Sequence, residues 1–201
     1  ISSNRVILVA SGGVSLEDVI REGEKYFLLP SSSSLTFDQV LPVTRNEVIN
    51  IEPYKGKEQV HMILAFRTVP VDHPDNFTLD IIAEVLGGGR ASILTKELRY
   101  QRGLVYGVGA SQMGLADAGS WNIRTSASKE KIQEVLDVIS VNIKRILNEG
   151  LTESEIQFAK DKITKSQRME LQDSSSWVDF HTYPQLLSLK PWTLLDYLEG
   201  I

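Results

Sequence analysis

The sequence predicts a two-layer α+β domain in which helices pack on one face of a mainly antiparallel sheet. Residues 59–68 form an alternating run that is apolar on both faces. Residues 104–115 and 121–125 have the side chains of two strands joined by a turn at residues 117–119. The segments between and after these strands repeat apolar residues at helical spacing. The order strand, helix, helix, hairpin, helix, helix favours two layers.

Composition and charge restrict the classes of function. The chain has 201 residues, of which 42% are hydrophobic and 23% charged, the profile of a globular protein. Its formal charge of -5 gives no basic surface, so nucleic acid is not expected as a partner. The lack of cysteine excludes disulfides, thiolate metal ligands and cysteine nucleophiles. No apolar run approaches the ~18 residues of a membrane span, and the first residues lack a signal-peptide pattern, which leaves the compartment open.

The N-terminal part is predicted to stand apart from the rest. Residues 5–10, RVILVA, are an apolar β-branched run before Ser11-Gly12-Gly13, which predicts a buried strand and a turn. Ser15 with Asp18 three residues later is a capping signature for a following helix. Four consecutive serines and two prolines within residues 28–45 are typical of a linker. We therefore expect a strand–helix unit over residues 1–30, a linker over 31–57 and the main domain over 58–201.

The main domain is expected to begin with an inner strand, QVHMILAFRT, because both faces of this run are apolar. Asp72 or His73 is expected to cap the helix that follows, with Pro74 in its first turn. That helix repeats apolar side chains at helical spacing, namely Phe77, Ile81, Ile82, Val85 and Leu86. The glycines at positions 87–89 are expected to end it.

A second short helix is expected over residues 91–101. It would turn Ile93, Leu94 and Leu98 inward and leave Lys96 and Arg99 free. Gly103 would then let the chain reverse, so that Tyr106 lies at the start of the first hairpin strand.

The C-terminal third is expected to be helical. A long amphipathic helix begins near Ile132 and is ended by Gly150. Thr152 with Glu155 forms a capping box for the next helix. The remainder, residues 153–201, is predicted to be helical with breaks near residues 174–176 and Pro191.

Two motifs suggest functions that their context does not support. The glycine-rich stretch over residues 86–110 suggests phosphate binding, but it follows a helix, lacks Gly-Lys-Ser/Thr, and has Gln112 at the third glycine position of the dinucleotide fingerprint. The tripeptide at residues 73–75 matches that of J-domain co-chaperones, where it joins two helices, whereas a strand precedes it here. A serine hydrolase has no support either, because no Gly-x-Ser-x-Gly elbow is present.

Zinc held wholly by this chain is not expected. The three histidines, His61, His73 and His181, include no pair at helical ligand spacing beside a carboxylate. His61 and His181 are more simply explained as packed, hydrogen-bonded residues. By composition alone, Arg99 is a solvated charge and Tyr106 an aromatic at the edge of the core.

From residue 59 onward the order of motifs resembles the C-terminal, non-catalytic domain of the pitrilysin/insulysin zinc metallopeptidases, the family that includes the mitochondrial processing peptidase. The residues that carry the resemblance are Asp72-His-Pro-Asp75, Leu86-Gly-Gly-Gly-Arg-Ala-Ser92, Glu97-Leu-Arg99, Arg102-Gly-Leu-Val-Tyr106-Gly-Val, the Gly119 hairpin and Gly150-Leu-Thr-Glu-Ser-Glu155. Residues 1–30 are similar to the closing strand and helix of the preceding family domain. The resemblance thus covers nearly the whole chain.

The resemblance implies an architecture and a function. It implies a processing-peptidase-like metallohydrolase domain, here ending before its final strand and helix, as in a piece of a longer protein. Family members that cleave peptides carry His-x-x-Glu-His in the N-terminal domain, and this sequence contains no such motif. The zinc cofactor is therefore expected in a partner N-terminal domain or subunit, with a peptide as substrate.

The resemblance also implies a role for two residues. In the family, the arginine and tyrosine at the positions of Arg99 and Tyr106 reach across a clamshell to hold the substrate backbone and support the oxyanion near the metal. The alternative is a family-derived scaffold or assembly domain without peptidase activity. Residues 5–27 are expected to fill the vacant closing position of the main sheet, in the same molecule or exchanged in a strand-swapped homodimer.

Overall fold

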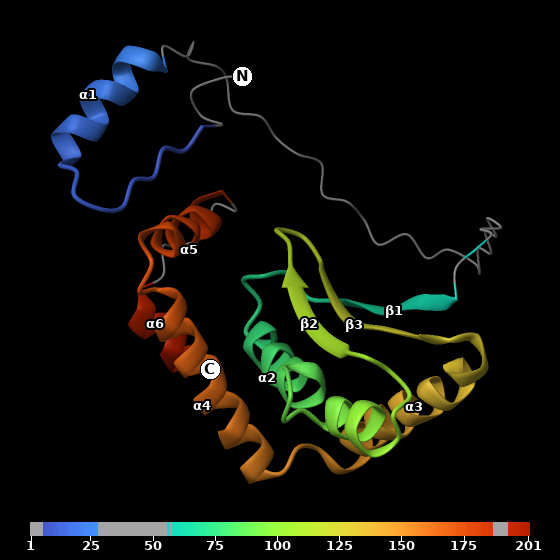
Figure 1. The fold of residues 1–201 in the computed structure, drawn as a ribbon. Coiled ribbons are helices and arrows are strands. Elements are labelled where there is room, and N and C mark those ends of the chain that lie inside the picture. Colours follow the sequence, from blue (N-terminus) through green and yellow to red (C-terminus); the bar gives the residue numbers. More distant parts are fainter. Residues whose placement is uncertain (1–5, 28–55, 57, 187–192) are drawn as a thin grey trace. The chain divides into compact units, whose positions relative to one another are not determined.

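The computed structural model describes residues 6–27, 56, 58–186 and 193–201. The chain divides into two compact units, Ile1–Gln39 with Thr164–Gly200, and Val40–Ile163 with Ile201. The second unit holds the sheet and has the predicted α+β fold (Figure 1). Residues 28–55 and Pro191, on which most of the predicted linker and the last predicted break fall, lie outside the described residues. The limits predicted for the domains stay a prediction.

Three antiparallel strands form the sheet of the described chain: β1 (Gln59–Thr68), β2 (Val108–Gly114) and β3 (Gly119–Ser128), in the order β1-β3-β2. The predicted hairpin of β2 and β3 is confirmed. The predicted inner position of β1 is wrong, because β3 is the central strand and β1 lies at an edge of the described sheet. The apolar pattern on both faces did not predict burial on both faces, since Ile63 is 62% exposed, and the order of strands depends on which segments pair.

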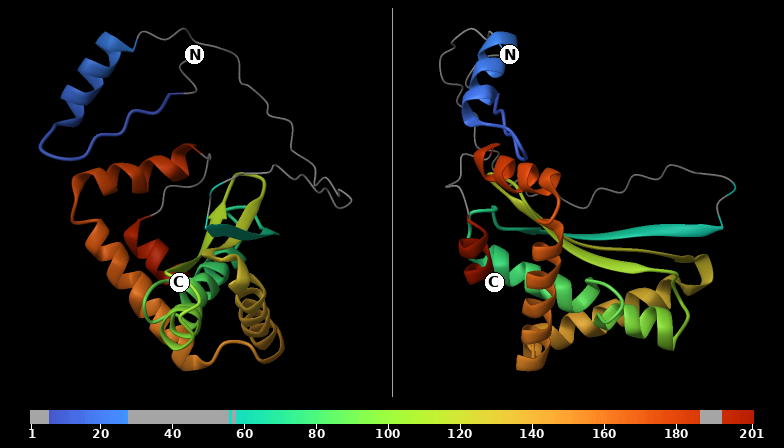
Figure 2. Two further views of the ribbon diagram at one scale, coloured as in Figure 1. Left: turned by 45° about the vertical axis from the view of Figure 1, so that its right-hand side comes forward. Right: turned by 60° about the vertical axis from the view of Figure 1, so that its left-hand side comes forward.

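Helices cover one face of this sheet (Figures 1 and 2). They are α2 (Asp75–Gly87), the π-helix η2 (Thr95–Gln101) and α3 (Ile132–Glu149), which follows a short 3-10 turn, η3 (Lys129–Lys131). The core lies between the sheet and these helices, and its fully buried members are Leu86, Leu94, Leu98, Ile123, Val135 and Ile139. Leu94 and Leu98, which were predicted to face inward, are therefore buried, and Ile93 packs against the same core.

The glycine run ends α2, as predicted, and its three members have different surroundings. Gly87 is buried, because the helix there approaches β2 so closely that a Cβ would lie 2.7 Å from both the Ala110 Cβ and the Gly109 carbonyl carbon. Gly89 has a φ of +126°, a conformation that side chains rarely adopt. The first glycine thus permits close packing and the third permits the turn.

The start of α2 matches the capping prediction in part. The helix begins at Asp75, directly after Pro74, and the His73 Nδ1 accepts a hydrogen bond from the Asp75 backbone N–H at 3.2 Å. His73 and Asp75, two residues of the tripeptide, therefore contact each other at the start of the helix.

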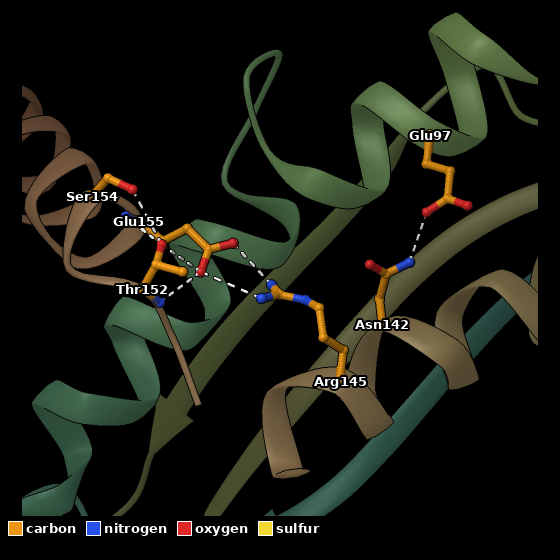
Figure 3. Close-up of polar contacts among 6 residues, drawn as sticks. All are labelled: Glu97, Asn142, Arg145, Thr152, Ser154 and Glu155. Carbon is orange, nitrogen blue, oxygen red and sulfur yellow. Dashed lines mark hydrogen bonds and ion pairs between the residues drawn. The ribbon is translucent and has the colours of Figure 1, made fainter. Parts of the chain in front are cut away.

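The predicted capping box joins α3 to α4 (Glu153–Glu170). The Thr152 N–H donates to Glu155 Oε2 at 2.8 Å, and the Glu155 N–H donates to Thr152 Oγ1 at 3.3 Å. Arg145 of α3 adds a hydrogen bond from Nη2 to Glu155 Oε1 at 2.9 Å, as Figure 3 shows. The start of α4 is therefore tied to the side of α3.

The first unit contains α1 (Leu16–Tyr26), α5 (Ser174–Leu186) and α6 (Leu194–Gly200), and α4 runs into it. The predicted cap of α1 is confirmed, since Ser15 Oγ accepts from the Asp18 N–H at 3.1 Å. The break before α5 falls at residues 171–173, slightly earlier than predicted. No helix in the described part of the chain combines the length and apolar character needed to span a membrane.

The predicted buried strand at residues 5–10 is wrong for the residues that the structure describes. Val6–Ala10 carries no strand, and the Leu8 side chain is 51% exposed. A β-prone apolar run becomes a strand only when a neighbour completes its hydrogen bonds, and these residues are not part of the described sheet. Addition of this strand to the sheet of the same molecule is therefore not observed, while its exchange between two molecules stays a prediction.

Replacing Gly87 with alanine is expected to lower the free energy of unfolding by about 1–3 kcal/mol, because the added methyl group would collide with the backbone of β2. Gly107→Ala is the matched control, since no atom lies within 4 Å of a Cβ at that position. It should change the free energy of unfolding by less than about 0.5 kcal/mol. Urea unfolding measures both; a stabilised Gly87→Ala variant would contradict the close packing of α2 on β2.

The pH dependence of stability is expected to include Glu155. Desolvation alone would raise the pKa of Glu155, but hydrogen bonds from Thr152 and Arg145 outweigh it and hold the pKa below its usual value. The folded state thus prefers the carboxylate, a stabilisation present above the unfolded pKa of about 4.3 and lost as the pH falls through the folded pKa. Glu155→Gln should therefore unfold at lower urea than the wild type at pH 7.

The same comparison near pH 3.5 should give a smaller difference between Glu155→Gln and the wild type, because the stabilisation from the carboxylate decreases as the pH falls below the unfolded pKa. Glu149→Gln, an exposed glutamate at the end of α3, is the control and should show no loss at either pH. An equal loss at both pH values for Glu155→Gln would mean that the charge of Glu155 contributes nothing.

Candidate functional site

Arg99 is placed by η2, whose inward side is anchored in the core. Leu94, just before η2, and Leu98 within it are both 0% exposed. Arg99 follows directly and is half-buried. The predicted helix is thus present, but over Thr95–Gln101 it is wound as a π-helix, which the apolar spacing does not indicate.

Tyr106 lies in the connection between η2 and β2. Gly103 reverses the chain with a φ of +59°, and the Leu104 N–H donates to the Leu98 carbonyl at 2.8 Å. Leu104 and Val105 are buried, whereas the Tyr106 side chain is 82% exposed. The prediction that Tyr106 begins a strand is wrong, because pairing with β3 starts only at Val108.

The structure brings Arg99 and Tyr106 together. The Arg99 Cζ lies 5.0 Å from the centroid of the Tyr106 ring. It also lies 5.5 Å from the centroid of the Tyr100 ring, which is 53% exposed. The guanidinium offers several N–H donors in a fixed plane, and a phenol offers one O–H donor. The three side chains form an exposed ledge that can donate hydrogen bonds to carbonyl oxygens or to developing negative charge.

Tyr100 was not singled out by its position in the sequence. The signal that could have found Tyr100 is its place directly after Arg99 in the sequence, since neighbouring side chains on a short helix can contact each other. The cation–π contacts of Arg99 with these two aromatic rings are favourable. At exposed sites such contacts contribute only about 0.5–1 kcal/mol.

The histidines do not form a site in the described chain. His61 is exposed on β1, so the prediction that it is packed is wrong, because His61 lies on the face of the strand opposite to Met62 and Leu64, which pack on the core. His181 is also exposed, with its ring stacked on Trp177 at 5.6 Å. Among the described residues, no group of three or more histidine, cysteine, aspartate or glutamate side chains could hold a metal ion.

Asp80 of α2 is a perturbed carboxyl that the sequence did not indicate. Burial raises the pKa of Asp80 to about 6. A perturbed pKa favours a functional site only where partner groups converge on it. No group of metal-ligating side chains in the described chain includes it, so Asp80 enters no proposal here.

An apolar groove of about 240 Å³ lies at the edge of the core. Its lining comes from β1, α2, β3 and α3 and includes Phe66, Leu79, Ile82, Trp121 and Leu147. Because this lining is almost wholly apolar, the groove offers packing surface and no groups for catalysis.

Solved structures share this α+β architecture. A crystal structure of a peptidase M16 inactive domain from Pseudomonas fluorescens matches with a TM-score of 0.61 and 25% identity, covering 71% of this chain and 33% of that chain. A protease from Helicobacter pylori matches with a TM-score of 0.72 and 18% identity, covering 94% of this chain and 47% of that chain, which shows a common fold alone. The class is thus a domain with the fold of peptidase-family proteins.

The sequence comparison identifies the family. Residues 1–163 match the peptidase M16 inactive domain, and the chain belongs to this family, which confirms the resemblance. It is 31% identical over 124 residues to an uncharacterized zinc protease of Mycobacterium leprae (strain TN), covering 62% of this chain and 28% of that protein. It is 25% identical over 198 residues to an uncharacterized zinc protease of Bacillus subtilis (strain 168), covering 98% of this chain and 48% of that protein. The chain thus spans half or less of these relatives.

We expect the isolated chain to bind no zinc stoichiometrically and to hydrolyse no peptide, because its histidines are not spaced as a three-ligand set beside a general base. Metal analysis after dialysis measures this directly. One tightly held zinc per chain, lost in His61→Ala or His73→Ala, would contradict the assignment of this chain to a non-catalytic domain.

Proposed function

We propose that this chain is the substrate-binding, non-catalytic half of a zinc-dependent metalloendopeptidase. In this proposal it completes the active-site cleft of a zinc-bearing N-terminal domain or subunit of the same family, and the zinc cofactor belongs to that partner. The substrate is a peptide, held in the cleft between the two halves.

The observation that carries the proposal is the contact of Arg99 with Tyr106 on an exposed ledge. Arg99 is half-buried and anchored by η2, whereas Tyr106 is 82% exposed with its ring 5.0 Å from the guanidinium. Solvated surface residues separated by seven positions have no general reason to meet in this way. Donors held in a fixed arrangement on a rigid support are what stabilisation of an oxyanion requires.

Membership of the inactive-domain family supports the remaining parts of the proposal. The curated relatives are named zinc proteases, and this chain covers 28% and 48% of the two described above. Their length leaves room for a further domain beside the part that this chain matches. A zinc-bearing partner domain is consistent with that difference in length.

In the complete enzyme, Arg99→Ala or Tyr106→Phe is expected to lower turnover of a peptide substrate by about 10-fold to 1000-fold, as does loss of one oxyanion donor in other enzymes. The double variant should lose little more than the single variants, because residues that act as a unit are non-additive. Melting temperatures should change little, since neither substitution opens a cavity in the core. Steady-state kinetics and thermal melts measure these effects.

A matched control comes from a second exposed cation and tyrosine in this chain. Lys25 Nζ lies 4.7 Å from the centroid of the Tyr26 ring on α1. Lys25→Ala and Tyr26→Phe should leave turnover at the wild-type level. Wild-type turnover in both Arg99→Ala and Tyr106→Phe would reject the proposed site and favour a scaffold domain without a role in cleavage.

A further inference from the structure

The π-helical winding of η2 is held by contacts that have no part in the ledge itself. The Arg102 N–H donates to the Glu97 carbonyl at 3.1 Å, one residue further along than in an α-helix. π-turns are rare and occur mostly as single turns at functional sites. Because the winding sets the direction in which each side chain leaves the helix, the direction of Arg99 depends on this turn.

The carboxylate of Glu97 connects the turn to its surroundings at both oxygens. Oε1 accepts a hydrogen bond from Arg102 Nη2 at 2.9 Å, so the side chains at the two ends of the π-turn are joined. Oε2 accepts one from Asn142 Nδ2 of α3 at 2.8 Å, as Figure 3 shows. Arg102 also donates to Glu134 of α3 at 3.3 Å. Each side of the turn is thus linked to α3.

Asn142 is the buried member of this set, with 7% of its surface exposed. Its Nδ2 also donates to the Val138 carbonyl of its own helix at 2.9 Å. Both hydrogens of the amide therefore have acceptors, and loss of Glu97 would leave one of them unsatisfied in the interior.

Arg99 depends on this support because its own contacts are weak. Among the described residues, the contacts found for its guanidinium are with the rings of Tyr100 and Tyr106, whose centroids lie 5.5 and 5.0 Å from Cζ. Weak cation–π contacts of this kind do not by themselves fix a long side chain in one place. The backbone of η2 must do so, and Glu97 lies two residues before Arg99 on that backbone.

We infer that Glu97 and Asn142 are a positioning pair, which holds the π-turn of η2 so that Arg99 meets Tyr106. Neither side chain touches the substrate. Glu97 and Asn142 act through Arg99, and this inference rests on the proposed function of the ledge.

The test is a double-mutant cycle in the complete enzyme, with Asn142→Ala, Arg99→Ala and their combination. Asn142→Ala should lower kcat/KM by about 10-fold to 100-fold, mainly through kcat, since small misplacements of a group that stabilises the transition state have effects of this size. In the Arg99→Ala background the same substitution should lower kcat/KM no further. Asn148→Ala, an exposed asparagine on the same helix, is the matched control and should have wild-type kinetics.

Substitutions of Glu97 test the same pair of residues in an equivalent double-mutant cycle. They replace Asn142→Ala if that variant does not fold. Glu97→Gln keeps one oxygen that can accept from Asn142 but loses the acceptor for Arg102, so it should retain more turnover than Glu97→Ala. Glu97→Ala should match Asn142→Ala. This rescue by the similar side chain is not expected if Glu97 contributes only its charge to general stability.

The outcomes separate the inference from the proposed function. Wild-type turnover in Arg99→Ala would reject the proposed function of the ledge. A loss in Arg99→Ala with wild-type turnover in Asn142→Ala would overturn the positioning pair alone. So would an Asn142→Ala effect of equal size in both backgrounds, because Asn142 would then act independently of Arg99.

Discussion

Burial of Ile123 under the helices is the constraint on which the rest of the second unit depends. Ile123 lies in the central strand, opposite Leu64 on one side and Ala110 on the other, and is 0% exposed. Full burial of one such side chain contributes about 1.5–3 kcal/mol. Leu94 and Leu98 belong to the same core, so η2 cannot shift without opening a cavity in it. The support of Arg99 is thereby part of the hydrophobic core.

Polar contacts at the periphery of the core fix how the helices lie against one another. Asn142 and Arg145, three residues apart on α3, contact Glu97 of η2 and Glu155 of α4 (Figure 3). Lys162 of α4 contacts Glu84 of α2 through an ion pair. The two ion pairs, Arg145 with Glu155 and Lys162 with Glu84, are partly exposed and contribute little to stability individually. Their effect is on position, because each adds a directional contact between two elements that already pack on the same core.

The site combines a rigid support with exposed groups. Leu104 and Val105 are buried, while Tyr106 directly after them is 82% exposed. The change from buried to exposed residues places the Tyr106 phenol in solvent, directly after two residues that are fixed in the core. A domain with this arrangement can present donors to a partner without itself holding a metal, which fits the division of tasks in the proposed peptidase.

The sequence by itself determined those features whose cause lies within a few residues. The caps at Ser15 and at Thr152 with Glu155, the end of α2 at its glycines and the β2–β3 hairpin all depend on local hydrogen bonds and backbone freedom. The sequence also identified Arg99 and Tyr106 as candidates, through a resemblance of motifs. These predictions needed no knowledge of distant contacts.

Tertiary structure alone decided the features that depend on partners far away in the chain. The edge position of β1 follows from its pairing with β3, and His61 is exposed because it lies on the face of the sheet opposite to Met62 and Leu64. The lack of a strand at Val6–Ala10 follows from the lack of a paired neighbour in the described sheet. The π-winding of η2 accompanies the contact of Glu97 with Asn142, 45 residues later. Such choices are set by the geometry of long-range packing and pairing, which local spacing does not contain.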